Sequence, residues 1–117
     1  MTNMHKVGAA GLLAAWLALG GGCYRNTVSE IELNIPALQG EACVQPIREA
    51  LNRLGEGAVI DIRVDVPART LWVKYDNVRL GRRNVEVAVR HAGYAVNDLP
   101  ADEDARAKLP AECRGND

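Results

Sequence analysis

Apolar and polar residues alternate along three segments of this chain, a pattern typical of strands that bury one face and expose the other. The segments cover residues 30–35, 60–66 and 70–75. Only residues 67–69 separate the second segment from the third, so these two are expected to form a hairpin. Residues 94–97 are predicted to make a short fourth strand. The hairpin side chains expected on the buried face are Ile60, Ile62, Val64, Val66, Leu71, Val73 and Tyr75.

Two further segments repeat apolar residues every three or four positions, the spacing of amphipathic helices. The first covers residues 43–54 and is stopped by Gly55. The second covers residues 85–92, with Asn84 expected as its N-cap and Gly93 closing it. The resulting order is strand, helix, strand, strand, helix, strand. It predicts an α+β fold of the ferredoxin-like βαββαβ type, a four-stranded antiparallel sheet with both helices on one face.

The first 22 residues have the character of an export signal. Lys6 and the amino terminus supply positive charge, residues 7–19 are an apolar run, and three glycines precede Cys23. The run has 13 residues. Because a bilayer span needs ~20 residues, this run is too short to cross the membrane comfortably.

Gly22 and Cys23 resemble the end of a bacterial lipobox, in which lipid is attached to the cysteine, although Gly20 stands where leucine is typical. Lipid attachment at Cys23 therefore predicts a protein of the cell envelope, anchored on the periplasmic side of the outer or inner membrane. Ordinary cleavage and an uncleaved anchor are the alternatives. The chain then divides into a signal peptide (residues 1–22), a tether (23–27), a folded domain (28–98) and a tail (99–117) that has room for a short helix.

Composition and charge narrow the function further. Hydrophobic residues make up 48% of the chain and charged residues 25%, as in folded domains. Without its leader the chain has 13 basic residues (14 less Lys6) and 15 acidic ones. This balance argues against a nucleic-acid partner, which requires a positive face. Arg79, Arg82 and Arg83 form one basic cluster, which by itself identifies no partner.

The segment from Leu38 to Cys43, between the first strand and the first helix, resembles the loop of the heavy-metal-associated domain family. This family includes small copper chaperones and the periplasmic mercury-binding protein, and its loop carries the motif Met-x-Cys-x-x-Cys. In this chain Leu38 falls on the methionine, Gly40 on the first cysteine and Cys43 on the second. The resemblance extends to Val64-Asp65-Val66, Leu71-Trp72-Val73-Lys74-Tyr75-Asp76 and His91-Ala92-Gly93-Tyr94.

The resemblance implies binding of a soft metal ion (copper, zinc or mercury) by thiolates at this loop, because soft ions prefer sulfur ligands. Gly40 offers no ligand, so Cys113 in the tail is the candidate second sulfur beside Cys43. In the family, an aromatic residue at the position of Tyr94 packs close to the metal loop; here it is equally compatible with the core.

Three states of Cys43 and Cys113 remain open from the sequence. An oxidising compartment favours a disulfide between two remaining cysteines. Such a bridge would close a loop of about 70 residues and contribute roughly 3–4 kcal/mol. A metal site using both sulfurs and a pair of unlinked thiols are the alternatives. A homodimer that shares one ion between two Cys43 sulfurs is also compatible.

Other polar residues give weaker signals. His91 is expected near the exposed edge of the second helix, and Trp72 on the uncovered face of the sheet. Asp61 and Asp65 share a strand face with Arg63, which indicates a solvated stripe and not an acid–base pair. No motif of an enzyme is found, so catalysis is not expected.

Two functions follow from the sequence. The first is a lipid-anchored envelope protein that binds a soft metal ion and passes it to a metal-transfer protein partner. The second is a non-catalytic interaction module on the same fold, stapled by a Cys43–Cys113 disulfide, with the open sheet face around Trp72 meeting its partner.

Overall fold

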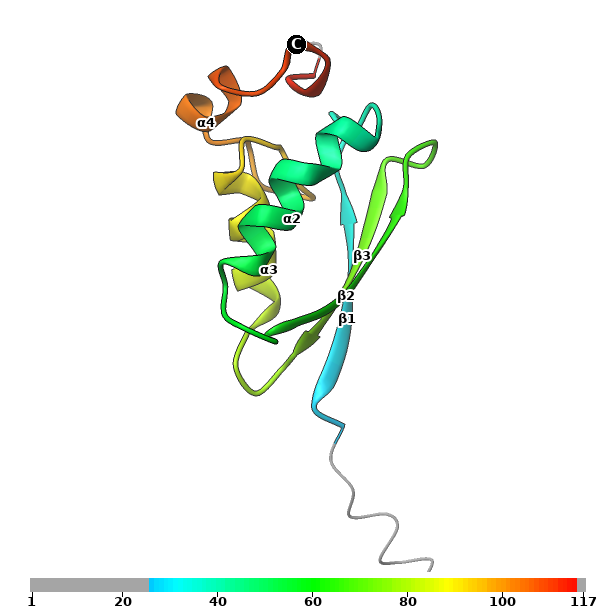
Figure 1. The fold of residues 1–117 in the computed structure, drawn as a ribbon, viewed down its shortest axis with the longest axis vertical. Coiled ribbons are helices and arrows are strands. Elements are labelled where there is room, and N and C mark those ends of the chain that lie inside the picture. The colour runs from blue at the N-terminus through cyan, green and yellow to red at the C-terminus, as the bar shows by residue number, and fades with distance from the viewer. Residues whose placement is uncertain (1–25, 116–117) are drawn as a thin grey trace, which may run out of the picture.

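The computed structural model describes residues 26–115, so the predicted leader and Cys23 lie outside the described residues. Three strands and three α-helices follow one another with two short 3-10 helices (Figure 1). In chain order they are β1 Val28–Asn34, η1 Glu41–Cys43, α2 Val44–Asn52, β2 Val59–Asp65, β3 Thr70–Asp76, α3 Arg82–His91, α4 Glu103–Ala107 and η2 Ala111–Cys113.

The sheet is antiparallel, with β3 in the centre between β1 and β2. Val73 is paired with Ile31 on one side and with Ile62 on the other, so apolar side chains from all three strands share one face. Helices α2 and α3 lie against this face (Figure 1). Residues alternating with them on the opposite face include Glu32 and Lys74, which are exposed. The predicted α+β plan is therefore present, with one face covered by helices and one open.

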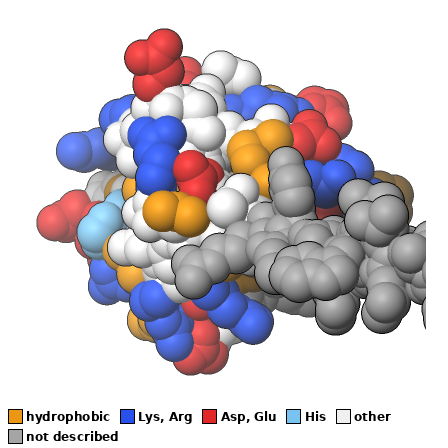
Figure 2. Space-filling view, turned by 90° about the horizontal axis from the view of Figure 1, so that it is seen from below, with side chains coloured by type: hydrophobic (Ala, Val, Ile, Leu, Met, Phe, Trp, Pro, Cys, Tyr) orange, Lys and Arg blue, Asp and Glu red, His pale blue; other side chains and the backbone are white. Residues whose placement is uncertain are grey.

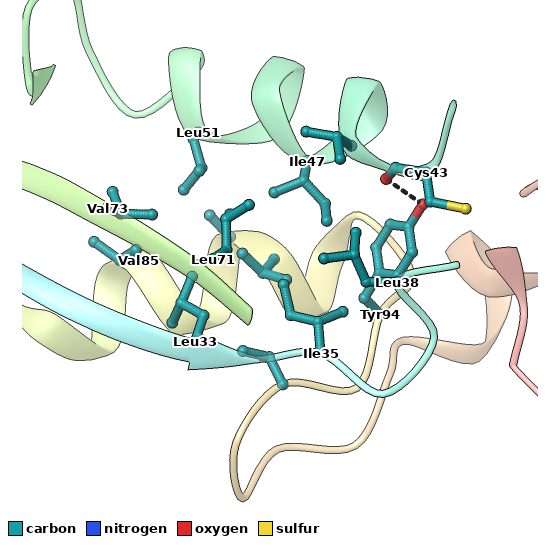
Figure 3. Packing of buried hydrophobic residues seen from close by; sticks show 14 of the residues in the cluster. Leu33, Ile35, Leu38, Cys43, Ile47, Leu51, Leu71, Val73, Val85 and Tyr94 are labelled. Atoms are coloured by element: carbon teal, nitrogen blue, oxygen red, sulfur yellow. Dashed lines mark hydrogen bonds between the residues drawn. The ribbon is translucent and has the colours of Figure 1, made fainter. Parts of the chain in front are cut away.

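The core fills the space between the sheet and the two helices (Figure 3). It is built almost entirely from aliphatic side chains, because the chain has no phenylalanine. Burying one such side chain contributes about 1.5–3 kcal/mol, so this layer is the main source of stability. The fully buried large side chains are Tyr94, Leu33, Ile35, Leu38, Ile47, Leu51, Leu71, Val44, Val73, Val85, Val89 and Val96.

The predicted fourth strand at residues 94–97 is wrong: in residues 26–115 the sheet has three strands. The chain reverses at this point through a single bridge between Val96 and Leu99. Asn97 has a left-handed backbone, with φ of 50°, and its side-chain oxygen accepts a hydrogen bond from the Asn34 amide at 2.8 Å. Its own amide donates to the Asn34 carbonyl at 3.0 Å. Asn97 thus pairs with the backbone of Asn34 at the edge of β1, which a fourth strand would have covered.

The strict alternation predicted for residues 60–66 also fails at one residue. The pairing of β2 with β3 shifts between Val59 and Asp61, which leaves Ile60 as an extra residue in a β-bulge. Ile60 is 52% exposed instead of buried. Beyond the bulge the predicted alternation resumes, because Ile62 is paired with Val73 on the helix-covered face.

The second helix begins earlier than the sequence suggested. Gly81, with an extended backbone, is the N-cap, and Asn84 lies inside the first turn. The Gly81 amide donates a hydrogen bond to Asn84 Oδ1 at 2.7 Å. Asn84 therefore caps the helix from its third position, by accepting a hydrogen bond from the N-cap residue. The sequence identified the capping residue but misplaced it by three positions.

Residues after Leu99 fold back over the end of the domain. Helix α4 packs directly against Gly93, whose backbone has φ of 107°. A Cβ on Gly93 would lie 2.8 Å from the Arg106 amide nitrogen and 2.9 Å from the Ala105 carbonyl carbon. Glycine is therefore required here both for its backbone angle and for the close approach of the tail.

Replacing this glycine tests how strongly the tail is seated. Gly93→Ala is expected to lower the free energy of unfolding by about 1–3 kcal/mol, because the methyl group clashes with helix backbone and the angle is strained. Chemical denaturation measures the change. Gly40→Ala is the matched control, since its backbone is extended and no atom lies within 4 Å of the new Cβ. Equal stability of the two variants would contradict the close packing.

Candidate metal centre

Cys43 lies where the first 3-10 helix passes into α2. Gly40 precedes η1 with an extended backbone, and its carbonyl accepts a hydrogen bond from the Cys43 amide at 3.0 Å. Cys43 is itself the N-cap of α2, so its side chain projects from the start of that helix. The side chain has no exposed surface. The loop thus places one sulfur at the end of the core, beneath the tail.

Cys113 supplies the second sulfur, as the sequence suggested. It ends η2 and forms a disulfide with Cys43, with an S–S distance of 2.07 Å and Cα atoms 5.4 Å apart. The two residues are 70 positions apart in the chain. The predicted disulfide is therefore present. In this oxidised state neither sulfur is a thiolate, which is the form that binds metal ions.

Tyr94 is the side chain that holds the Cys43 backbone. Its hydroxyl donates a hydrogen bond to the Cys43 carbonyl at 2.8 Å (Figure 3). Tyr94 is completely buried, and this burial raises its pKa to about 12. The neutral phenol is therefore favoured, and it fixes the position of the cysteine loop relative to the segment after α3.

The other motif positions provide space but no ligand. Leu38, on the methionine position of the family motif, is fully buried in the core. Gly40, on the first cysteine position, is open: a Cβ built there meets nothing within 4 Å. A second cysteine would therefore fit the loop sterically, although the chain carries none at this position.

Further protein ligands are not gathered around the two sulfurs. Within residues 26–115, no group of three or more histidine, cysteine, aspartate or glutamate side chains could hold a metal ion. His91 is exposed on α3, as expected. Trp72 lies on the open sheet face with the Arg63 guanidinium 5.0 Å from its ring centre, a cation–π contact. Cys43 and Cys113 are thus the only sulfur donors of the described chain.

Two arginines of the tail contribute to its position, and the sequence analysis missed them. Arg106 Nε donates to the Arg114 carbonyl at 2.7 Å, and Arg114 Nε donates to the Leu109 carbonyl at 2.9 Å. These bonds fold η2 back onto α4 and hold Cys113 in place. Their spacing of eight and five residues corresponds to no regular element, so no sequence pattern indicates them.

Two arginines of the predicted basic cluster bond to other residues of the domain. Arg83 Nη1 lies 3.2 Å from Asp98 and 3.5 Å from Glu86, and its hydrogen bond holds the pKa of Asp98 below the usual value. Arg79 donates to the Glu56 carbonyl at 2.7 Å. These arginines therefore fasten the loops at the start of α3 to neighbouring elements.

Removing the disulfide tests its contribution to stability. The double variant Cys43→Ala/Cys113→Ala is expected to lose about 4 kcal/mol of unfolding free energy in the chain-entropy description, because the bridge closes a long loop. Denaturant titration measures the loss. The single variant Cys113→Ala should lose nearly as much, since either change opens the loop. A loss below about 1 kcal/mol would show that the bridge adds no restraint.

The buried phenol predicts a loss of stability at high pH. Unfolded tyrosine ionises near 10.0, whereas folded Tyr94 holds its proton to about 12. Between these pH values the folded state binds more protons than the unfolded state. The contribution of Tyr94 to the free energy of unfolding is therefore fully present below pH 10 and decreases as the pH rises towards 12. The slope contributed by this group is at most about 1.4 kcal/mol per pH unit. Denaturation at stepped pH should show that Tyr94→Phe removes this slope and that Tyr75→Phe retains it.

Comparison with protein-family models and with curated protein sequences finds no match. Solved structures do show the fold. The crystal structure of oxidized MerP from Ralstonia metallidurans CH34 is 23% identical with a TM-score of 0.52, over 60% of this chain and 94% of that one. The solution structure of the "putative copper-ion-binding protein from Bacillus anthracis str. Ames" is 19% identical with a TM-score of 0.53, over 62% of this chain and 100% of that one. At these identities the likeness is one of fold, and it supports the ferredoxin-like plan.

Proposed function

We propose that this protein binds a soft metal ion, copper, zinc or mercury, between the reduced thiolates of Cys43 and Cys113, and that the disulfide is its closed, metal-free state. The observation that carries the proposal is the meeting of these two sulfurs, 70 residues apart in sequence, at the start of α2. This is the loop at which the resembling family holds its ion. The tail thus supplies the sulfur that the loop lacks at Gly40.

The donor chemistry fits such an ion. Soft ions prefer thiolate sulfur, and two sulfurs bonded to one ion at about 2.3 Å each lie at most about 4.6 Å apart. Opening the disulfide requires two electrons and two protons, which a dithiol reductant supplies while becoming a disulfide itself. Once reduced, the sulfurs need to separate by only about 2–3 Å to hold an ion between them.

The names of the two similar structures agree with this proposal. One is described as copper-ion-binding, and the other was solved in an oxidised form. The matches cover 94% and 100% of those chains but 60% and 62% of this one.

The proposed location is the cell envelope, with lipid on Cys23 anchoring the protein on the periplasmic side of a membrane. The charged, apolar and glycine segments of residues 1–22 support it. Within residues 26–115 no helix has the length and apolar character to cross a bilayer. A metal-transfer protein that gives or receives the ion is the proposed partner.

Metal titration of the two redox states tests the proposal. Reduced protein is expected to compete with a Cu(I) chelator for one ion per chain, and oxidised protein is expected not to compete. Cys43→Ser or Cys113→Ser should weaken binding by more than the ~10–100-fold that loss of an outer-shell partner costs, because each removes a ligand. Binding by reduced Cys113→Ser that equals the wild type would refute the shared site.

A matched variant shows whether the loop itself is competent. Gly40→Cys introduces a sulfur three residues before Cys43, at a position with an extended backbone and no atom within 4 Å. In the Cys113→Ser background it should restore Cu(I) binding. If Cys113→Ser alone loses Cu(I) binding and the added Gly40→Cys restores it, the loss is due to one missing sulfur. No restoration would mean that the loop cannot present thiolates to an ion.

The burial of the disulfide favours a second candidate, an interaction module that carries no metal. Cys43 and Cys113 both have no exposed surface, and the described chain gathers no further ligands. In this case the bridge is a permanent staple, and the open sheet face around Trp72 meets the partner. Intact-mass measurement of unreduced, envelope-derived protein after thiol alkylation separates the two. Alkylated Cys43 and Cys113 would exclude the permanent staple.

A further inference from the structure

The exposed large hydrophobic side chains of residues 26–115 gather at one end of the sheet. They are Val78, Ile60 and Val28, at 74%, 52% and 39% exposure. Val28 is paired with Asp76, two residues before Val78. The Asp76 amide also donates to Ala58, two residues before Ile60. All three residues therefore lie near the last residue of β3, and we call them the apolar end.

The chain enters the domain at this same end (Figure 1). The Asn77 amide donates to the Thr27 carbonyl at 2.9 Å, and Asn77 Nδ2 donates to the Asn26 carbonyl at 3.2 Å. Asn26 is thus fastened beside Val78. Cys23 lies three positions before it, and three extended steps of the chain span at most about 11 Å. A lipid on Cys23 would therefore hold Asn26, beside the apolar end, within this distance of the lipid attachment.

Charges of both signs are present at this end. Arg79 and Arg82 are exposed, as is Glu56, and Asp76 is half-buried. Figure 2 looks onto this end and shows hydrophobic side chains at the surface among basic and acidic ones. Because charges of both signs are mixed here, we expect the apolar side chains to contribute to contact with a bilayer.

We propose that the apolar end, formed by Val28, Ile60 and Val78, rests on the phospholipid bilayer in which Cys23 is anchored. This inference depends on the lipid anchor of the proposed function. Three apolar side chains bind a bilayer only weakly, but a tether of about 11 Å makes the contact intramolecular, so a weak contact is enough.

The contact fixes the orientation of the candidate metal centre. The Cys43–Cys113 bridge lies at the opposite end of the strands, where η1 follows the end of β1 and the tail passes over the domain (Figure 1). Strands of seven residues cover about 20 Å. With the apolar end on the lipid, the end of the domain that holds the two sulfurs lies away from the membrane.

Bromolipid quenching of a single tryptophan tests the orientation. Trp72 is the only tryptophan after residue 22, so the probes are placed in a Trp72→Phe background. The full lipidated chain carrying Val78→Trp is reconstituted into phosphatidylcholine vesicles with brominated acyl chains. We expect its fluorescence to be quenched and shifted to the blue, with little change at high salt. Ala68→Trp, in the exposed β2–β3 turn, is the matched control and should remain unquenched.

The outcomes separate the inference from its premise. Adding Ile60→Asp to the Val78→Trp protein should reduce quenching, and since Ile60 is exposed the fold is retained. Vesicle-bound protein without quenching at Val78→Trp, or with equal quenching at Ala68→Trp, would overturn the orientation while leaving the anchor intact. Protein that does not float with vesicles would overturn the anchor and the inference together. Neither result bears on Cu(I) binding by reduced protein in solution.

Discussion

The disulfide between Cys43 and Cys113 is the constraint that holds the tail on the end of the domain formed by the cysteine loop. It closes a loop of 70 residues and so ties the tail across the start of α2. Near it, Gly93 leaves room for the α4 backbone, and the hydrogen bonds of Arg106 and Arg114 fold η2 back onto α4. Leu109 of the tail, 7% exposed, also packs against the core at this end.

The fold differs from the complete four-stranded plan after α3. There the chain turns at Asn97, which has a left-handed backbone, before the tail continues to the cysteine loop. Asn97 then satisfies Asn34 at the edge of β1, and its Nδ2 donates to buried Glu86 at 2.7 Å. A side chain thus supplies part of the hydrogen bonding that a strand would have provided at this edge of the sheet.

The two ends of the sheet have different chemistry. One end carries both sulfurs beneath the tail, and the other carries Val78 and Ile60 beside the entering chain. Seven-residue strands separate them. In the proposed arrangement a redox-controlled metal centre is held at a distance from the membrane that anchors it, so that soluble carriers and reductants can both approach it.

Hydrophobic periodicity alone determined the three sheet strands and both main helices, because alternation and helical spacing reflect which face is buried. It did not determine the bulge at Ile60 or the turn at Asn97, since both depend on pairing with residues far along the chain. The motif alignment identified Cys43 and the vacancy at Gly40, and counting cysteines pointed to Cys113. Only the tertiary structure decided that these sulfurs meet, because no local pattern specifies where a tail 70 residues away will pack.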